Sequence, residues 1–286
     1  QKIKTTSDGS VLRDNYFNKP KMELGFEPKP LNDIDLIIID EGYSVPYWLK
    51  EHIESRNIKI LVAGDPEQLP PVGDKPVYLI DTSNIIILDE IIRQGVYSGI
   101  VYIADRIRKG LPLHKGFYGD VLIIDEHELT DRMILSSDIV ICGTNKTRDK
   151  INNRVRRDLL NIKSDLPIIN EKMVCRKNNW NIEVNGINLA NGLCGIITNM
   201  PGVHGFNGKE FKINFRPNML QESFIDLSCD YNYLISPYDK RRLLKNNKYS
   251  TGEKFEFAYS ITTHMSQGSQ YYNGIFIEEF LSKENH

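Results

Sequence analysis

Two short apolar runs near the start of the chain are each followed at once by polar residues. Residues 36–39 precede an Asp-Glu pair, and residues 60–63 lead into a Gly-Asp pair. Continuous apolar runs of this length, bounded by charge, are typical of strands buried in a parallel sheet. Residues 45–55, between the two runs, have helical spacing, with a proline in the first turn where a helix tolerates it. The pattern therefore predicts a strand, a helix and a second strand.

Helical and strand patterns continue to alternate after this unit, which favours an α/β fold with parallel sheets. We expect strands at 85–88, 121–124 and 138–142, and helices at 98–109, 129–136 and 146–160. From about residue 167 to residue 252 the pattern changes to short strands separated by Gly-Asn turns, which indicates a small all-β unit. Residues 257–259 are expected to return the chain to the parallel sheet.

Composition narrows the class of protein without identifying a function. The chain has 286 residues, of which 40% are hydrophobic and 26% are charged, as in an ordinary globular protein large enough for two domains. Lys and Arg number 36 against 38 acidic residues, so the formal net charge is −2. Any binding of nucleic acid must therefore depend on a local groove and not on overall charge.

Cysteine spacing points to a reducing compartment, and hydropathy points to a protein without membrane spans. The four cysteines form no CxxC pair, which disfavours structural zinc and favours free thiols. No apolar run approaches the length that spans a bilayer, and the first residues lack a signal-peptide pattern. We therefore expect a cytoplasmic protein with no membrane partner.

The acidic pair Asp40-Glu41 is the first candidate for chemistry. Carboxylates at the carboxyl end of a parallel strand stand in the crevice where open α/β sheets bind ligands. One acid can hold Mg²⁺ through its water shell, and a second can orient an attacking water. An acidic pair after a strand also commonly marks a helix N-terminus. The second strand end, with Asp65 and Gln68 in a loop stiffened by Pro70 and Pro71, favours nucleotide chemistry.

Several segments resemble the motifs of one helicase family, in the same order. DEGY at 40–43 and GDPEQLPPV at 64–72 resemble motifs II and III of superfamily 1 helicases, in particular the RecD-like and Dda-like branch of superfamily 1B. LDEIIRQ at 88–94 resembles motif IV, and NGLCGIIT at 191–198 resembles the signature of the SH3-like barrel of this branch. TTHMSQGSQ at 262–270 resembles motif V. The resemblance spans roughly residues 36–280.

The resemblance implies ATP and Mg²⁺ as cofactors. Asp40 would hold the metal and Glu41 would orient the attacking water. Gln68 would sense the γ-phosphate, and Arg93 would stabilise the charge that develops on it. The remaining residues expected to contact the nucleotide are Asp65, Gln267 and Gly268.

The resemblance also implies single-stranded DNA as a partner. The residues expected to face the strand are Pro70, Pro71, Thr144, Asn145, Thr263, His264 and Ser266. Thr144 and Asn145 precede a helix, so capping explains them equally well. Four aromatic residues are candidates either for stacking on bases or for the core of the small all-β unit: Trp180, Tyr231, Tyr233 and Tyr238.

Two missing segments suggest a fragment, and two substitutions also depart from the family pattern. Nothing in the sequence fits the phosphate-binding motif GxxxxGK[ST] (Walker A), which supplies an amide cradle and a lysine. Met265 stands where motif V has a lysine, and Gln270 where it often has an acid. The arginine-finger segment that follows motif V in the family is not found. We expect the chain to lack ATPase activity on its own.

The resulting hypothesis is an α/β protein with two RecA-like parallel-sheet domains of the P-loop NTPase type, at 1–135 and 136–286, both incomplete. An SH3-like β-barrel would be inserted in the second at about 167–252. The implied parent is an ATP-dependent DNA helicase that moves 5′ to 3′ on single-stranded DNA in replication, repair or recombination, with replication or recombination proteins as candidate partners. Two alternatives stay open, an inactive nucleic-acid-binding remnant and a non-helicase P-loop ATPase. The RQ element and the SQGS turn argue against the latter.

Overall fold

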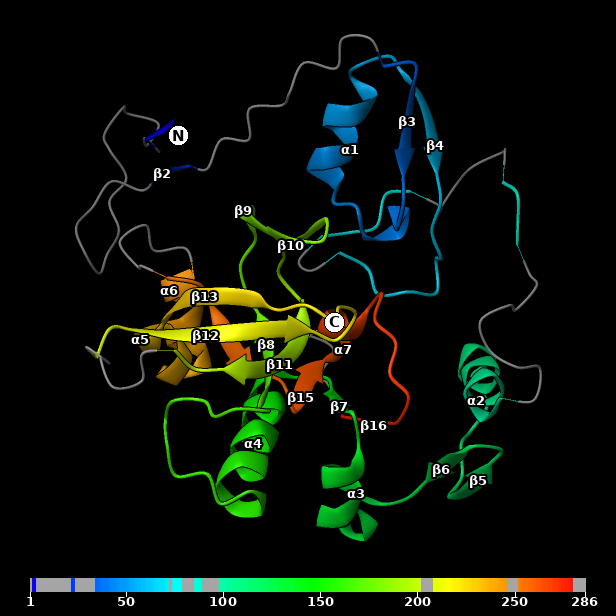
Figure 1. Ribbon diagram of the computed structural model, residues 1–286. Helices are drawn as coiled ribbons and strands as arrows, with labels where there is room; N and C mark the ends of the chain where they lie inside the picture. The colour runs from blue at the N-terminus through cyan, green and yellow to red at the C-terminus, as the bar shows by residue number, and fades with distance from the viewer. Residues whose placement is uncertain are drawn as a thin grey trace. The chain divides into compact units, whose positions relative to one another are not determined.

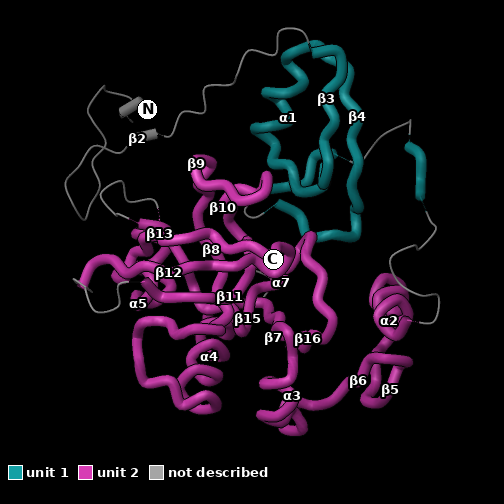
Figure 2. Tube along the Cα trace, in the orientation of Figure 1, with its two compact units in different colours: residues 1–93 teal, residues 94–286 magenta. Residues whose placement is uncertain are grey.

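The computed structural model describes residues 34–71, 74–78, 85–88, 98–201, 208–245 and 252–279, together with two short strands. These strands, β1 (Lys2–Ile3) and β2 (Met22–Glu23), pair in antiparallel fashion. The chain divides into two compact units, residues 1–93 and residues 94–286 (Figure 2).

The first unit contains a two-stranded parallel sheet covered by one helix (Figure 1). Strands β3 (Leu36–Ile39) and β4 (Lys59–Val62) run in register, with Ile39 opposite Val62 at their carboxyl ends. Between them lie the 3-10 turn η1 (Gly42–Ser44) and helix α1 (Tyr47–Glu54). The strand, helix and strand predicted from the hydrophobic pattern are confirmed.

The strand expected at residues 85–88 is not formed. These four apolar residues are described but have no strand partner among the described residues, and Ile86 and Leu88 are 90% and 91% exposed. An apolar run becomes a strand only where a neighbouring strand accepts its backbone hydrogen bonds. The hydrophobic pattern detected the apolar residues and could not supply that partner.

The second unit contains a three-stranded parallel sheet in the order β15-β7-β16. Its strands are β7 (Ile139–Cys142), β15 (Ser260–Thr262) and β16 (Gly274–Phe276). Helix α4 (Asn145–Arg154) follows β7 and continues through a π-helical turn (Val155–Leu159). The apolar face predicted for this helix is confirmed, because Ile151, Val155 and Leu159 pack in one cluster with Val140 of β7.

The larger sheet of the second unit is antiparallel, in the order β13-β12-β11-β8-β14. Its strands are β8 (Lys172–Cys175), β11 (Cys194–Asn199), β12 (Glu210–Pro217), β13 (Phe224–Asp230) and β14 (Phe255–Phe257). The largest hydrophobic cluster of the described residues lies here and includes Met173, Ile213, Phe215 and Phe255. The predicted change to short strands is confirmed, but two helices, at Tyr231–Ile235 and Tyr238–Lys245, lie within 167–252, so this segment is not all-β.

The two edges of this sheet approach each other without closing. Cys229 of β13 and Glu253, just before β14, form one isolated parallel bridge, with Glu253 N donating to Ser228 O at 2.6 Å. No ladder joins the edges, so no closed barrel is found among the described residues. Residues 255–257 extend the antiparallel sheet, and Tyr259 O then accepts from Val140 N of β7 at 3.0 Å. The predicted return at 257–259 is therefore confirmed at its last residue.

The other elements of the second unit are short. They are α2 (Gly99–Arg108), β5 (Gly116–Tyr118), β6 (Val121–Ile123), η2 (Glu126–Glu128), α3 (Asp131–Ser136), the hairpin of β9 (Asn179–Val184) and β10 (Ile187–Leu189), α5 (Tyr231–Ile235), α6 (Tyr238–Lys245) and α7 (Thr263–Ser266). The helix predicted at 98–109 is confirmed; it begins after the Ser98 cap and ends before Gly110, whose φ of +65° favours glycine.

The cysteine thiols are free, as their spacing predicted. All four cysteines are free, and burial raises the pKa of the Cys175 thiol to about 11, which keeps it protonated and unreactive near neutral pH. Within the described part of the chain, none of the helices combines the length and the apolar character needed to cross a bilayer.

Candidate functional site

The acidic pair lies in a sharp turn directly after β3. Both Asp40 and Glu41 are exposed, and the backbone N–H of Glu41 donates to Asp40 Oδ1 at 2.9 Å. Glu41 has φ 55° and ψ 41°, a left-handed conformation that costs a non-glycine residue about 1 kcal/mol. Backbone conformations of this kind are concentrated at functional sites. The turn presents two carboxylates to solvent at the end of a strand.

Hydrogen bonds hold this turn against the end of β4. Ala63 N donates to Ile39 O at 2.8 Å, and Gly42 N donates to Ala63 O at 2.9 Å. A Cβ at Gly42 would lie 2.2 Å from Val62 Cγ1, so only glycine permits this approach. The parallel register therefore places the acidic pair and the loop that begins at Gly64 at one edge of the sheet.

The loop after β4 folds back on Asp65. Glu67 N donates to Asp65 Oδ1 at 2.9 Å, and Gln68 N donates to Asp65 O at 3.2 Å. Gln68 and Pro70 are exposed, and Pro71 is half-buried. Arg93, the predicted arginine of this site, lies outside the described residues.

The donor set at this edge suits a hard cation. Mg²⁺ prefers oxygen ligands and is usually held by one or two carboxylates together with water. The exposed carboxylate of Asp40 meets that requirement, and Glu41 is its immediate neighbour in the turn. The residues therefore fit water-mediated binding of Mg²⁺ by Asp40.

In the second unit a parallel register brings two further turns together. Thr262 at the end of β15 lies opposite Cys142 at the end of β7, and Thr263 Oγ1 donates to Cys142 O at 3.1 Å. Ser266 Oγ donates to Thr263 O at 2.8 Å, which closes the short helix α7 on itself. The turn after β7 and the turn after β15 therefore share the carboxyl edge of the sheet.

The outer part of the α7 turn is open to solvent. His264, Gln267 and Gly268 are exposed, whereas Thr263 and Ser266 are half-buried. Gly268 has φ 75°, and nothing lies within 4 Å of where its Cβ would be, so the backbone itself is accessible there. These are the properties that a close backbone approach to a ligand requires.

The start of α4 is occupied by a carboxylate that the sequence analysis did not identify. Thr144 caps the helix, and its Oγ1 accepts from Thr147 N at 3.1 Å. Glu279, three residues after β16, accepts from Thr144 N at 2.8 Å and from Thr144 Oγ1 at 3.1 Å. Glu279 also accepts from Gly143 N and from Thr147 Oγ1. The acids that follow the apolar run of β16 were the only local sign of this contact.

Electrostatics explain why Glu279 stays ionised. Burial by itself would raise its pKa, but hydrogen bonds from the Thr147 hydroxyl, the amides of Thr144 and Gly143 and the Thr144 hydroxyl outweigh burial and lower the pKa below its ordinary value. Free amides at a helix start bind anions. The turn predicted to hold a phosphate therefore holds an anion of the protein itself.

The four aromatic residues that could stack on bases or pack in the core differ in how exposed their side chains are. Tyr233 is 1% exposed and donates its hydroxyl to Glu256 at 2.7 Å, so stacking on a base is excluded for this residue and the alternative, a place in the core, is confirmed. Tyr231 packs against the core of the antiparallel sheet, and Tyr238 is half-buried. Trp180, on strand β9, is 67% exposed and remains available for stacking.

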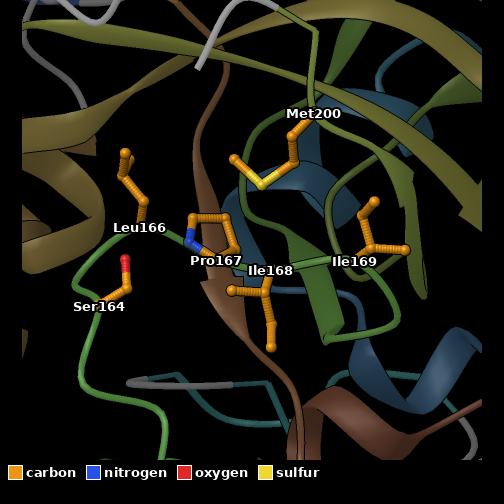
Figure 3. A pocket seen from close by; sticks show the side chains of 6 residues that line it. All are labelled: Ser164, Leu166, Pro167, Ile168, Ile169 and Met200. Atoms are coloured by element: carbon orange, nitrogen blue, oxygen red, sulfur yellow. The ribbon is translucent and has the colours of Figure 1, made fainter. Parts of the chain in front are cut away.

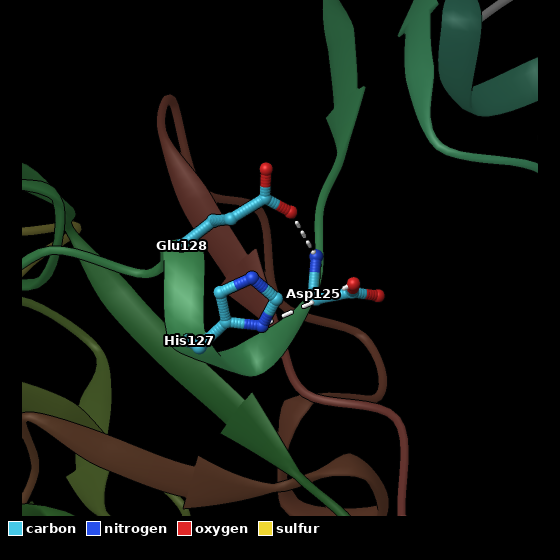
Figure 4. Close-up of side chains that lie close together, drawn as sticks. All are labelled: Asp125, His127 and Glu128. Carbon is cyan, nitrogen blue, oxygen red and sulfur yellow. Dashed lines mark hydrogen bonds and ion pairs between the residues drawn. The ribbon is translucent and has the colours of Figure 1, made fainter.

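An acidic cluster and an apolar pocket lie apart from the predicted site residues. Asp125, His127 and Glu128 lie close together (Figure 4), but Asp125 and Glu128 form a capping box and both pair with Lys115. An open apolar pocket is lined by Leu166, Pro167, Ile168, Ile169, Met200 and Ser164 (Figure 3). None of the predicted site residues lines it.

Similarity to solved structures identifies the fold. The structure of two coordinating Pif1 helicases unwinding forked double-stranded DNA matches with a TM-score of 0.52 and 19% identity over 85% of this chain and 63% of that chain. Pif1 helicase from Candida albicans matches with a TM-score of 0.50 and 15% identity over 85% and 65%. Pif1 helicase from Bacteroides in complex with ADP-AlF3 and single-stranded DNA matches with a TM-score of 0.50 and 16% identity over 92% and 69%.

The chain thus has the fold of these Pif1 helicases, and it spans less than two thirds of the length of the first two. No family model and no curated protein matches the sequence.

Proposed function

We propose that this chain is part of a superfamily 1B DNA helicase, a motor that couples ATP hydrolysis to movement along single-stranded DNA. One observation carries the proposal. In each unit, two parallel strands end side by side and bring separate helicase-like motifs to one edge of the sheet. In the first unit these are Asp40-Glu41 and the Asp65 loop. In the second unit they are the Thr144 turn and α7. Ligands of open α/β sheets bind at this edge.

The first edge is proposed to serve the nucleotide. Asp40 would hold Mg²⁺ through water, and the ion would neutralise charge on the phosphates. Glu41, exposed and fixed by the turn, would orient the attacking water and accept its proton. Gln68 would sense the γ-phosphate and Arg93 would stabilise its developing charge. On the second unit, the nucleotide contacts would be Gln267 and Gly268.

The strand is proposed to contact Pro70, Pro71 and the α7 turn, where Thr263, His264 and Ser266 supply polar groups. His264 is exposed and Thr263 and Ser266 are half-buried, so a strand can reach these groups from solvent, which supports this assignment. Thr144 and Asn145 would join only when the carboxylate of Glu279 leaves the amides of the α4 turn.

The finer assignments rest on the motif resemblance. They are RecA-like domains at 1–135 and 136–286, an SH3-like insertion at about 167–252, membership of the RecD-like branch, movement from 5′ to 3′, and a role in replication, repair or recombination. The bridge between Cys229 and Glu253 supports the insertion, since it brings the two edges of the antiparallel sheet together.

A second candidate is a nucleic-acid-binding remnant without catalysis. Two observations favour it: Met265 packs against a hydrophobic cluster in place of a solvated lysine, and Glu279 occupies the α4 amides. Both candidates bind single-stranded DNA, and only the motor hydrolyses ATP.

Binding and phosphate release test the proposal directly. The 286-residue chain should bind a single-stranded oligonucleotide with an affinity that falls as salt rises, because phosphate contacts release counterions. Thr263→Ala with His264→Ala should weaken this binding. If wild type and double variant bind equally across a salt series, the strand does not lie on α7.

We expect phosphate release by this chain to stay at background, with or without oligonucleotide. Four groups expected at the first edge, Asp40, Glu41, Gln68 and Arg93, offer two negative charges and one positive, which repel a triphosphate that is not anchored elsewhere. DNA-stimulated release that Glu41→Gln abolishes would instead show that the chain is a working motor.

A further inference from the structure

A buried ionic cluster in the second unit joins β14, α4, α6 and the residue that follows β8. Glu256 on β14 is 3% exposed and faces three guanidinium groups. Arg148 Nη2 lies 3.0 Å and Arg241 Nη1 3.3 Å from Glu256 Oε2, and Arg176 Nε lies 3.3 Å from Glu256 Oε1. Asp149 pairs with both Arg148 and Arg241.

The cluster has more positive than negative charge. Three guanidinium groups face two carboxylates, which leaves one positive charge in excess. Arg148 and Arg241 each pair with two carboxylates, whereas Arg176 pairs only with Glu256 among the described residues. Its Nε is buried and lacks a well-aligned hydrogen bond. Arg176 is therefore the least neutralised member of the cluster.

A lysine is coupled electrostatically to Arg176. Lys245, at the end of α6, is half-buried, and burial followed by repulsion from Arg176 lowers its pKa. No ion pair of Lys245 is found among the described residues. The positive charge around Arg176 thus exceeds that of the cluster alone.

Arg176 extends from this cluster to the α7 turn. Its Nη1 lies 3.4 Å from Sδ of Met265, the residue between His264 and Ser266. A thioether is a weak acceptor and cannot neutralise a guanidinium. The Arg176 guanidinium is anchored by Glu256 on one side. The Arg176 side chain is 16% exposed, so solvent still reaches it.

We propose that Arg176 binds a phosphodiester group of the strand that lies on α7. The proposal rests on the proposed function. The guanidinium fork matches a phosphate in two parallel hydrogen bonds, and its anchoring by Glu256 lowers the entropy lost on binding. A phosphate would also balance the excess charge. Met265 leaves the turn without a cation of its own, and Arg176 supplies one from the antiparallel sheet.

The test compares two variants that each remove one positive charge. Arg176→Gln removes the proposed contact, and Arg132→Gln removes an exposed arginine from α3 in the same unit. Anisotropy titrations with a fluorescent single-stranded oligonucleotide over a salt series should show about a tenfold loss of affinity for Arg176→Gln. The slope of log affinity against log salt should fall by about 0.7, the value for one phosphate contact. Arg132→Gln should match wild type in both.

A charge transplant separates a ligand contact from a fold defect. Met265→Lys in the Arg176→Gln background should restore most of the lost affinity, because the new ammonium reaches the same phosphate. Met265→Lys alone should add little, since it places a second cation against Arg176. A loss caused by misfolding would not be restored by a lysine at 265, and thermal unfolding of each variant checks this.

The outcomes separate the two proposals. If Arg176→Gln binds like Arg132→Gln while Thr263→Ala with His264→Ala weakens binding, the phosphate contact is overturned and the proposed function stands. If wild type shows no salt-dependent binding of the oligonucleotide, the proposed function fails and the contact fails with it. If Arg176→Gln weakens binding of a fluorescent ATP analogue and leaves DNA affinity unchanged, the phosphate is the nucleotide's and the assignment to the strand is wrong.

Discussion

The two units differ in how much buried apolar core supports the elements that carry their motifs. In the first unit, Ile39 and Tyr78 are the buried apolar side chains among the described residues, and Ile38 and Leu61 are 66% and 55% exposed. In the second unit, three hydrophobic clusters support the sheets, and the α7 turn is tied to β7 by a side-chain hydrogen bond.

The contrast shows that motif strength and local stability are separate properties. DEGY and GDPEQLPPV are the most specific segments of the sequence, yet they lie on a two-stranded sheet with little burial. A two-stranded sheet gains little stability from its own hydrogen bonds. We therefore expect hydrogen exchange to be faster in β3 and β4 than in β8, β11 and β12.

The largest expected effect comes from the buried ionic cluster of the second unit. Glu256→Gln leaves Arg148, Arg176 and Arg241 with one carboxylate between them and should lower the free energy of unfolding by about 3–5 kcal/mol. Urea denaturation followed by circular dichroism measures the loss, and Glu222→Gln, an exposed acid in the same unit, is the control. A cost below about 1 kcal/mol would mean that the cluster is open to water.

A matched pair in β3 measures how much core the first unit has. Ile39→Ala removes a side chain that is 8% exposed and should cost about 2–4 kcal/mol, seen as faster hydrogen exchange in β3 and β4. Ile38→Ala, at 66% exposure, should change stability by less than about 0.5 kcal/mol. Equal effects of the two would show that the face carrying Ile38 is covered, and the contrast between the units would disappear.

The carboxylate at the α4 turn gives a pH-dependent prediction. Because the folded pKa of Glu279 lies below its ordinary value of 4.5, its contribution to stability is complete above that value and is lost as pH falls through the folded pKa. Glu279→Gln should therefore destabilise the second unit by about 1 kcal/mol at pH 7. The difference from wild type should shrink below pH 4.5. A difference that grows on acidification would contradict the assigned hydrogen bonds.

The smallest expected effect is on DNA affinity. Glu279→Gln removes a negative charge from the amides of Gly143 and Thr144 and should raise affinity for a single-stranded oligonucleotide about threefold at low salt. Glu278→Gln removes the same charge from the exposed neighbouring residue and serves as the control. If both variants gain equally, net charge and not access to the α4 turn explains the effect.

The sequence by itself determined the local features of this protein. Strands β3 and β4, helices α1 and α2 and the apolar face of α4 follow from periodicity and caps, which depend on neighbouring residues. The candidate chemistry after β3, β4 and β15 was equally visible, because each motif is continuous in the chain.

Tertiary structure decided what these local features contact. Residues 85–88 had the pattern of a strand and have no strand partner among the described residues. Tyr233 is buried, and its hydroxyl donates to Glu256. Glu279 reaches Thr144 across 135 positions, and Arg176 reaches Met265 across 89. Such contacts are set by the register of parallel strands and by the route of the chain between them. Neither quantity is written in any short stretch of sequence, because each depends on how distant segments pack together.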